Sequence, residues 1–430
     1  MSVNASNLGL SIEQAGKVLN AAFKQATGQE VISQLAMGDY VSIATMAQRV
    51  GYETMTNALS QVLTRTYIRV RAYSAKFRSL IKTEEQYGNM VRKITYIDRD
   101  IPEGDMTRQI EDGKEYSPYK VRKPQAIQTA YYGFNHIDDY ITIFKNQWDT
   151  ALSSGSELQR FISGIMQEWY NKLEQYHEQY SRATLINLIG GTQAYNKDTA
   201  VTGASLTRPE MVRHLLTEYN TEHGTTLTRD ALLADRTAFT QFAEDLAYKM
   251  DTIVRQMGER TTLYHVSPLK SITAEGVAVT VPIKRHTPRE NLQCYMLAPF
   301  WDRVKRVVRP GLFANEYLEY IKFDEVAFWQ DISTPEQINA DVSYFKPAVT
   351  NVAGSKTTYA VNNDSGEAAV ELPYVLGVMF DDEAAAICYK NMWSAATPMN
   401  PAHGFQTNYI HEDVQWRNDN TENCCVLLLD

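Results

Sequence analysis

The chain has 430 residues, 44% of them hydrophobic, and a net charge of −9 from 42 basic and 51 acidic side chains. This length predicts two or three domains with enough residues to bury sizeable cores. The acidic balance argues against long, tight binding to nucleic acid, and no stretch reaches the roughly eighteen apolar residues of a membrane span. The first residues lack the basic and apolar regions of a signal peptide, which predicts a protein made and kept in the cytoplasm.

Residues 1–65 predict a helical arm. Ser11 to Gln14 has the pattern of a capping box, and apolar residues follow it at helical spacing. Two further short helices are expected over residues 39–50 and 53–63, on either side of Gly51. The arm is too short and too weakly apolar to predict an independent domain.

Residues 98–123 form an unusual segment of mixed charge. The acids are Asp98, Asp100, Glu103, Asp105, Glu111, Asp112 and Glu115, and the bases are Arg99, Arg108, Lys114, Lys120, Arg122 and Lys123. Because its large apolar residues are few and scattered, the segment cannot build a core, and a disordered linker is one interpretation. The interspersed signs and the apolar strands on either side, including residues 140–144, favour a long exposed β-hairpin that meets another subunit.

The longest predicted helix runs from Ser156 to Ile189. Ser156 to Gln159 has a capping-box pattern, and Gly190 with Gly191 predicts the end of the helix. At about 1.5 Å per residue the helix would be roughly 50 Å long, the width of a whole domain. The apolar residues expected on one face are Leu158, Ile162, Ile165, Trp169, Leu173, Tyr176, Tyr180 and Ala183.

The middle of the chain predicts two more helices and then becomes rich in strands. Thr207 to Glu210 would cap a helix that ends near Gly224, and Asp235 would begin another that ends at Gly258. The second helix would bury one face, made of Phe239, Phe242, Leu246, Met250, Ile253 and Met257. Strands are expected over 261–266, 276–283 and 292–297, short helices over 301–307 and 315–320, and a loop or exposed hairpin over 349–364. This order of helices and strands in runs is typical of an α+β protein.

The last 59 residues predict a chain end that is built into a sheet. Residues 372–380 are apolar enough for a strand that is covered on both faces, and residues 381–390 have the charge order of a short helix. Strands are expected over 405–416 and 426–429, joined by the polar run from Asn418 to Asn423. The four cysteines, Cys294, Cys388, Cys424 and Cys425, are expected to be reduced core thiols.

Motifs of catalysis and cofactor binding are absent from the sequence, which has no phosphate-binding loop, dinucleotide fingerprint or nucleophile elbow. Glu174 and His177 match the Glu-x-x-His spacing of di-iron bundles, but the second copy that this chemistry needs is missing, so a solvated helix face is favoured. His403 and His411 are interpreted as turn and strand-surface residues. No catalytic residue, cofactor or metal is therefore predicted, and a structural or binding protein is favoured over an enzyme.

The order of these elements resembles the major capsid protein of tailed bacteriophages, which has the lambdoid-phage head fold. The similarity includes the strand Val375–Asp381, the expected helix at Ala384–Ala386, the turn Thr397–Pro401 and the run Asp419–Asn423 before a terminal apolar strand. It implies an N-terminal arm (1–65), an E-loop and entry into the peripheral (P) domain (66–150), and a spine helix of that domain (151–204). An axial (A) domain (205–368) and the C-terminal part of the P domain (369–430) would follow.

The resemblance implies a virion protein whose copies assemble into pentamers and hexamers of an icosahedral head around double-stranded DNA. A scaffolding protein and a portal are expected partners, decoration proteins are possible ones, and contact with the packaged DNA would be weak. The E-loop residues expected to contact a neighbouring subunit are Arg99, Arg108, Glu111, Asp112, Lys114, Glu115, Lys120 and Arg122. A tail or connector protein, an encapsulin-like shell and, less favoured, a soluble enzyme are the alternatives.

Overall fold

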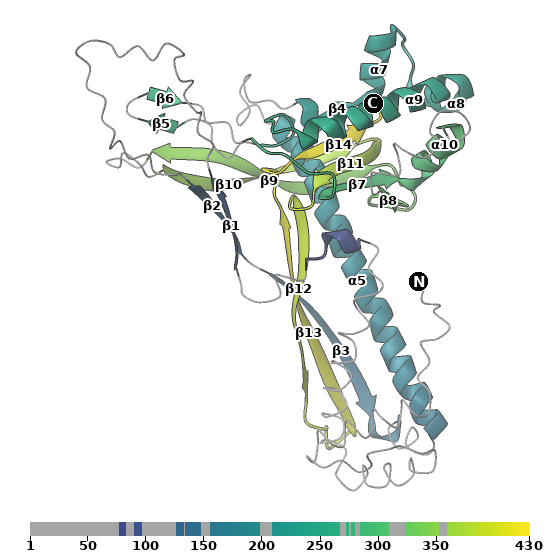
Figure 1. Ribbon diagram of the computed structural model, residues 1–430. Coiled ribbons are helices and arrows are strands. Elements are labelled where there is room, and N and C mark those ends of the chain that lie inside the picture. The colour runs from purple at the N-terminus through teal and green to yellow at the C-terminus, as the bar shows by residue number, and fades with distance from the viewer. Residues whose placement is uncertain are drawn as a thin grey trace, which may run out of the picture. The chain divides into compact units, whose positions relative to one another are not determined.

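The computed structural model describes residues 77–82, 90–96, 126–132, 134–147, 155–197, 209–266, 272–274, 277–279, 284–308, 323–351 and 359–430 (Figure 1). They fall into two compact units. The first takes its described residues from Met1–Asn89, Gly133–Ser181 and Ile387–Trp416, and the second from Met90–Tyr132, Arg182–Ala386 and Arg417–Asp430. The predicted arm and the residues at the tip of the predicted E-loop lie outside the described residues.

The first unit combines a three-stranded sheet with the first part of the long helix α5 (Gly155–Lys197). The sheet has the order β12 (Ala385–Ala396), β13 (Phe405–Asn418) and β3 (Asn135–Phe144), and β13 pairs antiparallel with β3. A short 3-10 helix, η3 (Arg78–Leu80), precedes a parallel bridge between Ile81 and Ile387. Ile137, Ile387 and Val414 form a buried cluster in this unit.

The second unit is built on a five-stranded sheet. Its order is β4 (Val212–His214), β14 (Cys424–Leu428), β11 (Val375–Asp381), β7 (Leu292–Leu297) and β8 (Phe323–Val326). The outer pairs β4–β14 and β7–β8 are parallel, whereas the inner pairs are antiparallel. Every residue of β11 and β14 is buried, which confirms a strand covered on both faces and a chain end inside a sheet. All four cysteines are buried and free, as predicted.

Among its described residues, the second unit contains the end of α5 from Arg182 and the helices η4 (Pro209–Met211), α7 (Leu215–His223), α8 (Arg229–Ala234), α9 (Arg236–Gly258) and α10 (Ala298–Val308). Asp235 caps α9 by accepting a hydrogen bond from the Thr237 amide, and all six residues predicted for its apolar face are buried. Gly224 ends α7 with a φ of 63°, the left-handed conformation that glycine adopts without strain.

The described part of the second unit also has three antiparallel strand pairs outside the central sheet. β9 (Ile338–Asn351) pairs along its whole length with β10 (Tyr359–Leu372), which confirms a hairpin in the predicted loop region 349–364. β1 (Met90–Tyr96) pairs with β2 (Ala126–Tyr132), and β5 (Ile272–Ala274) pairs with β6 (Val277–Val279). The residues 140–144, expected to flank the E-loop hairpin, belong instead to β3 and pair with β13.

The predicted end of the long helix is wrong, because α5 continues through Gly190 and Gly191 to Lys197. A Cβ atom on Gly190 would lie 2.6 Å from a methyl carbon of Val342, and one on Gly191 would lie 3.1 Å from the Ser343 carbonyl oxygen. The two glycines therefore allow β9 to approach the helix closely and do not stop it.

The predicted face of α5 is also offset from the buried one. Tyr176 is 48% exposed and Ala183 is exposed, whereas the neighbouring His177 and Thr184 are buried with Leu173. The buried stripe includes polar side chains, so a search for apolar residues alone selects the wrong register.

Other predicted elements differ from the structure near strand ends. Residues 381–390 form a turn and the start of β12, not a helix, although three consecutive alanines there favour a helix. Those alanines are buried, so packing in the interior overrides their local preference. The helix expected to start after Thr207, which lies outside the described residues, begins only at Leu215, after η4 and β4. Residues 261–266 make a single isolated bridge instead of a strand.

Candidate functional site: a hairpin anchored by buried charges

The β1–β2 hairpin lies at the base of the mixed-charge segment, and its two faces differ. Lys93 pairs with Thr129 and Val91 with Tyr131, and these four side chains share one half-buried face. Ile94, on the opposite face, is 59% exposed. This alternation is the ordinary pattern of a two-stranded ribbon with one face on a core.

Lys93 connects the hairpin to the C-terminal turn of the second unit. Its Nζ atom lies 2.6 Å from Asp419 Oδ2 and also contacts Glu422 Oε1. The Asp419 carboxylate additionally accepts hydrogen bonds from the backbone amide and the hydroxyl of Thr421, at 3.0 and 2.5 Å. Both carboxylates are buried, so the Lys93 ammonium lies between two charges that would be costly to bury without a cation.

The pKa values of these groups follow from burial and pairing. Burial opposes the charge on Lys93, but the charges of Asp419 and Glu422 raise its pKa above the usual value. Burial would likewise raise the pKa of Asp419, yet Lys93 and the hydrogen bonds from Thr421 and Tyr131 hold it below its usual value. Burial raises the pKa of Glu422 in spite of Lys93 and Arg285. Asp419 is therefore the firmly ionised partner of Lys93.

Arg285 adds a second cation to this anchor. One of its terminal nitrogens, Nη2, lies 3.3 Å from Glu422 Oε1 and donates to Thr95 Oγ1 at 3.2 Å, while Nε donates to the Thr421 carbonyl at 3.2 Å. Arg285 thus contacts both the hairpin and the turn. Together, Lys93, Arg285, Asp419 and Glu422 form what we call the hairpin anchor.

The turn that supplies the two acids is itself buried and held by hydrogen bonds on several sides. Its backbone donates from Asp419 to the Ala384 carbonyl at 2.7 Å and accepts at Asn420 from the Val266 amide at 2.8 Å. The Asn423 side chain donates to Thr287 Oγ1 at 3.0 Å. A polar run that reads as a surface loop is therefore a fixed part of the core, and it gives the hairpin anchor a rigid base.

The eight residues predicted to contact a neighbouring subunit lie in the segment between β1 and β2, outside the described residues. The prediction missed the acids of the hairpin anchor, because a turn with Asp, Asn and Thr is normally solvated. No sequence pattern singles out Lys93 or Tyr131, because the opposite face of these strands also carries apolar residues, including Ile94 and Ala130.

Three histidines of the first unit, His136, His177 and His411, pair with carboxylates. His177 Nε2 lies 3.0 Å from Glu412 Oε2, and both side chains are buried. The His177 ring also contacts the Tyr389 ring, with centroids 3.9 Å apart and the planes tilted by 35°. His177 is therefore neither on a solvated helix face nor, with Glu174, part of a repeated Glu-x-x-His site. His411 pairs with Asp138 on the neighbouring strand, in agreement with its predicted strand-surface role.

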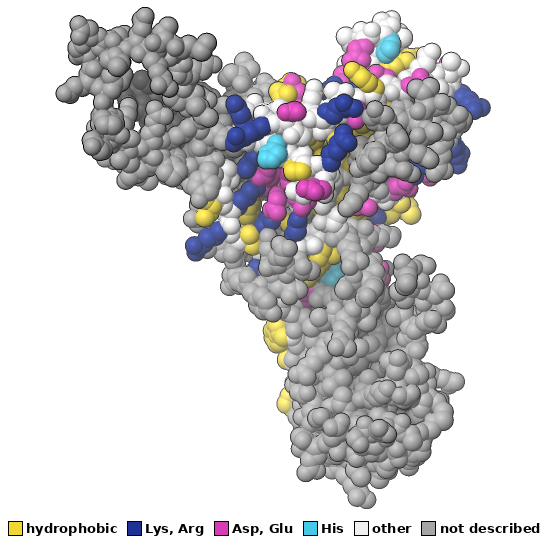
Figure 2. Space-filling view, in the orientation of Figure 1, with side chains coloured by type: hydrophobic (Ala, Val, Ile, Leu, Met, Phe, Trp, Pro, Cys, Tyr) yellow, Lys and Arg dark blue, Asp and Glu magenta, His cyan; other side chains and the backbone are white. Residues whose placement is uncertain are grey.

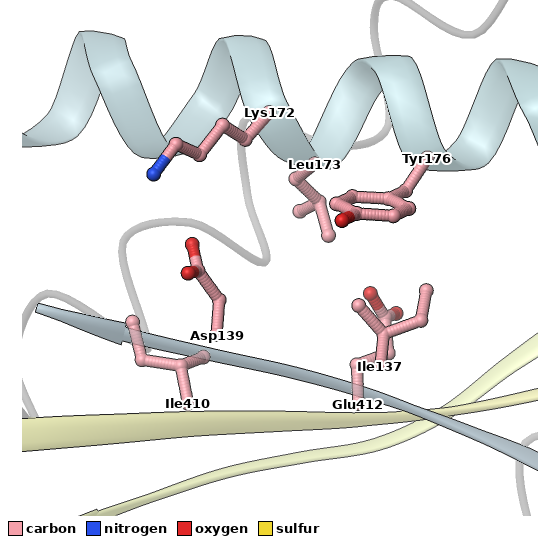
Figure 3. Close-up of a pocket in the computed structure, with 7 residues that line it drawn as sticks. All are labelled: Ile137, Asp139, Lys172, Leu173, Tyr176, Ile410 and Glu412. Carbon is pink, nitrogen blue, oxygen red and sulfur yellow. The ribbon is translucent and has the colours of Figure 1, made fainter.

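The cavity between α5 and this sheet is too small for an organic ligand. Figure 3 shows Leu173 and Tyr176 on the helix above Ile137, Ile410 and Glu412 of the strands. The cavity has a volume of about 10 Å³, close to that of one water molecule, whereas ligand sites typically measure about 300 to 1,000 Å³.

One cluster of possible metal ligands occurs among the described residues, formed by Glu222, His223 and Asp245. The Lys249 Nζ atom lies 3.1 Å from both Glu222 Oε2 and Asp245 Oδ2. Because this ammonium already supplies a positive charge between the acids, the cluster does not indicate a metal site.

Charged side chains of both signs are intermingled over the described surface seen in Figure 2. Among the described residues on this face, neither sign forms a continuous stripe. Among the described helices, none is both long and apolar enough to cross a membrane.

A family model for Phi29-like phage major capsid proteins matches residues 19–428 of the chain. No curated protein matches it. Similar solved structures include the capsid structure of Staphylococcus phage Andhra (10% identity, 84% of this chain and 85% of that chain, TM-score 0.47). Another is a chain from the structure of the head fibre and inner core protein gp22 of bacteriophage P68 (11% identity, 84% of this chain and 86% of that chain, TM-score 0.47). A third is from the capsid of cyanophage Pam1 (10% identity, 83% of this chain and 93% of that chain, TM-score 0.40). The family match alone covers well over half of the chain, which therefore belongs to the family of Phi29-like phage major capsid proteins.

Proposed function

We propose that copies of this chain close into pentamers and hexamers, which join into an icosahedral head around double-stranded DNA. As a member of a major capsid family, the chain is a structural protein of the virion and not an enzyme. Head-to-tail contacts between identical subunits generate rings when the rotation closes. Each contact can be modest, because a subunit in a shell is held by many contacts at once.

The mixed-charge segment between β1 and β2 serves in this proposal as an arm that lies on a neighbouring subunit. The observation that supports it is the hairpin anchor, in which Lys93 and Arg285 tie the base of the hairpin to a buried turn. Because the base of the arm is already fixed, the arm loses less conformational entropy when it docks on a neighbouring subunit. Alternating charges on such an arm favour one register on the partner over others.

Reversing three bases of the arm tests this role. Replacing Arg108, Lys114 and Arg122 by glutamate should leave the subunit folded but prevent particle formation, because the arm would then present like charges to its partner. Particles would be counted by electron microscopy and folding followed by thermal unfolding. The matched control exchanges the same residues within their charge class (Arg108→Lys, Lys114→Arg, Arg122→Lys) and should assemble. Normal particles from the reversed variant would contradict the proposed role of the arm.

The proposed partners are a scaffolding protein and a portal, with weak contact to the packaged DNA. The acidic net charge of −9 supports weak contact, because it repels the phosphates of the DNA. Weak contact suits a genome that must leave the head again. Electron microscopy of particles made with and without the other head proteins tests the scaffold requirement. Closed heads that contain DNA support the phage-head proposal, whereas tubes, or shells that never take up DNA, support a tail or encapsulin-like protein.

A further inference from the structure

A groove of about 430 Å³ opens between three helices of the second unit. It lies between the end of α8, the start of α9 and the outer half of α10, and its apolar part is formed by Leu233, Phe239 and Val307. Unlike the cavity beneath α5, it has room for a side chain or a short peptide segment. We call it the arginine groove, after the three arginines that line it.

Arg236, Arg303 and Arg306 give the groove its charge. All three are exposed, and no carboxylate among the described residues pairs with any of them. Arg303 is held in place, since its Nη2 donates to the Leu233 carbonyl at 2.6 Å and its guanidinium lies over the Phe239 ring, 5.1 Å from the centroid. The groove therefore combines an apolar floor with unpaired positive charge, which fits an apolar side chain next to a carboxylate.

A loop elsewhere in the same unit has this chemistry. It follows β8 and carries Ile332, which at 78% is the most exposed of the large hydrophobic side chains described. Asp331 stands beside it, exposed, with its Oδ1 atom accepting a hydrogen bond from the Ser333 amide at 2.9 Å. That hydrogen bond lowers the pKa of Asp331 and keeps the carboxylate ionised. We call this pair the acidic knob.

The acidic knob is held rigidly by the residues on both sides of it. The Trp329 amide donates to the Pro335 carbonyl at 3.0 Å, and its indole Nε1 donates to the Val375 carbonyl of the central sheet at 2.9 Å. Gln330 and Asn339 exchange two hydrogen bonds of 2.7 Å. A loop fixed in this way loses little conformational entropy when it binds, which suits an interaction surface.

We propose that the acidic knob of one subunit docks into the arginine groove of a neighbouring copy of the same chain. Ile332 covers the apolar floor, and the carboxylate of Asp331 pairs with the guanidinium groups. The knob and the groove share no residue, so the contact is heterologous, the type from which identical subunits build rings. This inference rests on the proposed assembly into rings and names a contact that would form them.

A disulfide across the predicted contact provides a direct test. In an Ile332→Cys/Val307→Cys variant, oxidation of assembled particles should link neighbouring subunits into a ladder on a non-reducing gel, while each single variant should stay monomeric on the gel. The native cysteines are all buried and leave the background low. Intact particles whose doubly substituted subunits remain unlinked would overturn the proposal.

A charge exchange separates the contact from a general loss of folding. Arg306→Glu and Asp331→Arg should each reduce the yield of particles by about tenfold or more, and the double variant should restore it. Unchanged melting temperatures show that the subunits are folded. The proposed contact would be overturned if both single variants formed particles in normal yield, or if the double variant did not restore the yield. It would also be overturned if a single variant formed normal heads that lacked only DNA. Wild-type particles in the same experiment measure ring assembly itself, so a failure of the proposed function is seen separately.

Discussion

At the scale of single residues, Lys93 has the largest predicted effect on the stability of the second unit. Its ammonium is the group shared by Asp419 and Glu422, and both carboxylates are buried. Lys93→Met should lower the free energy of unfolding by about 3 to 5 kcal/mol, because it leaves two buried charges with one cation fewer. Urea denaturation measures the change. Arg92→Met, on the exposed face of the same strand, is the control and should change stability by less than about 0.5 kcal/mol.

The pH dependence of this loss follows from the directions of the pKa shifts. The pKa of Asp419 is lowered in the folded state, so its stabilising contribution is present above its unfolded value of about 3.9 and is lost as the pH falls below it. The pKa of Lys93 is raised, so its contribution is present below about 10.4 and is lost as the pH rises further. Wild type and Lys93→Met should therefore differ most near neutral pH. A difference that grows toward pH 3 would contradict this assignment.

At the scale of elements, the accuracy of prediction from sequence depends on whether local pattern and packing agree. In α9 they agree, because one apolar stripe, a capping aspartate and a terminal glycine all indicate the same helix. They disagree at Ala384 to Ala386, where a helix-forming run is drawn into a sheet. Local pattern and packing disagree again at Gly190 and Gly191. The strand β9 can approach the helix only because these residues have no Cβ atom, and it is some 150 residues away in the chain.

The hairpin anchor was not predicted for the same reason. Lys93 and Asp419 are 326 positions apart, and neither residue belongs to a motif that would link them. The polar turn from Asn418 to Asn423 was correctly placed between two strands, but its burial depends on Ala384, Val266 and Thr287, which come from three other segments. The residue types of a turn can be recognised in the local sequence, whereas the burial of that turn depends on residues that the fold brings near it.

Gly377 sets the distance between two strands of the central sheet. A Cβ atom there would lie 2.3 Å from Met296 Sδ and 2.6 Å from the Tyr295 carbonyl oxygen of β7. The backbone oxygen cannot move without breaking the sheet, so Gly377→Ala should destabilise the protein by about 1 to 3 kcal/mol. Gly258→Ala is the control, since its nearest atom would be 3.9 Å away. Thermal unfolding compares the two variants, and an equally stable Gly377→Ala protein would contradict the close approach of the strands.

At the scale of the whole molecule, both compact units are assembled from segments far apart in the chain. The first joins the start of α5 to β13, and the second closes only when β14 enters between β4 and β11. The first unit can therefore be complete only after Trp416 has been made, and the second only with the last residues of the chain. For a capsid subunit this order delays the finished interaction surfaces until the entire chain is available.

The strongest prediction at this scale concerns the last seven residues, Cys424 to Asp430. Their removal deletes β14, an inner strand whose residues are all buried, and leaves β4 and β11 with unpaired edges. The truncated protein should fail to fold and should aggregate, because the lost burial exceeds the total stability of a typical domain. Removal of Asp430 alone is the control. It costs the half-exposed pair with His214 and the two hydrogen bonds that Thr217 donates to the Asp430 carbonyl oxygen, and should lower stability by about 1 to 3 kcal/mol, far less than the loss of β14. Solubility and circular dichroism distinguish the two, and soluble, assembling protein without β14 would refute a chain end that is part of the core.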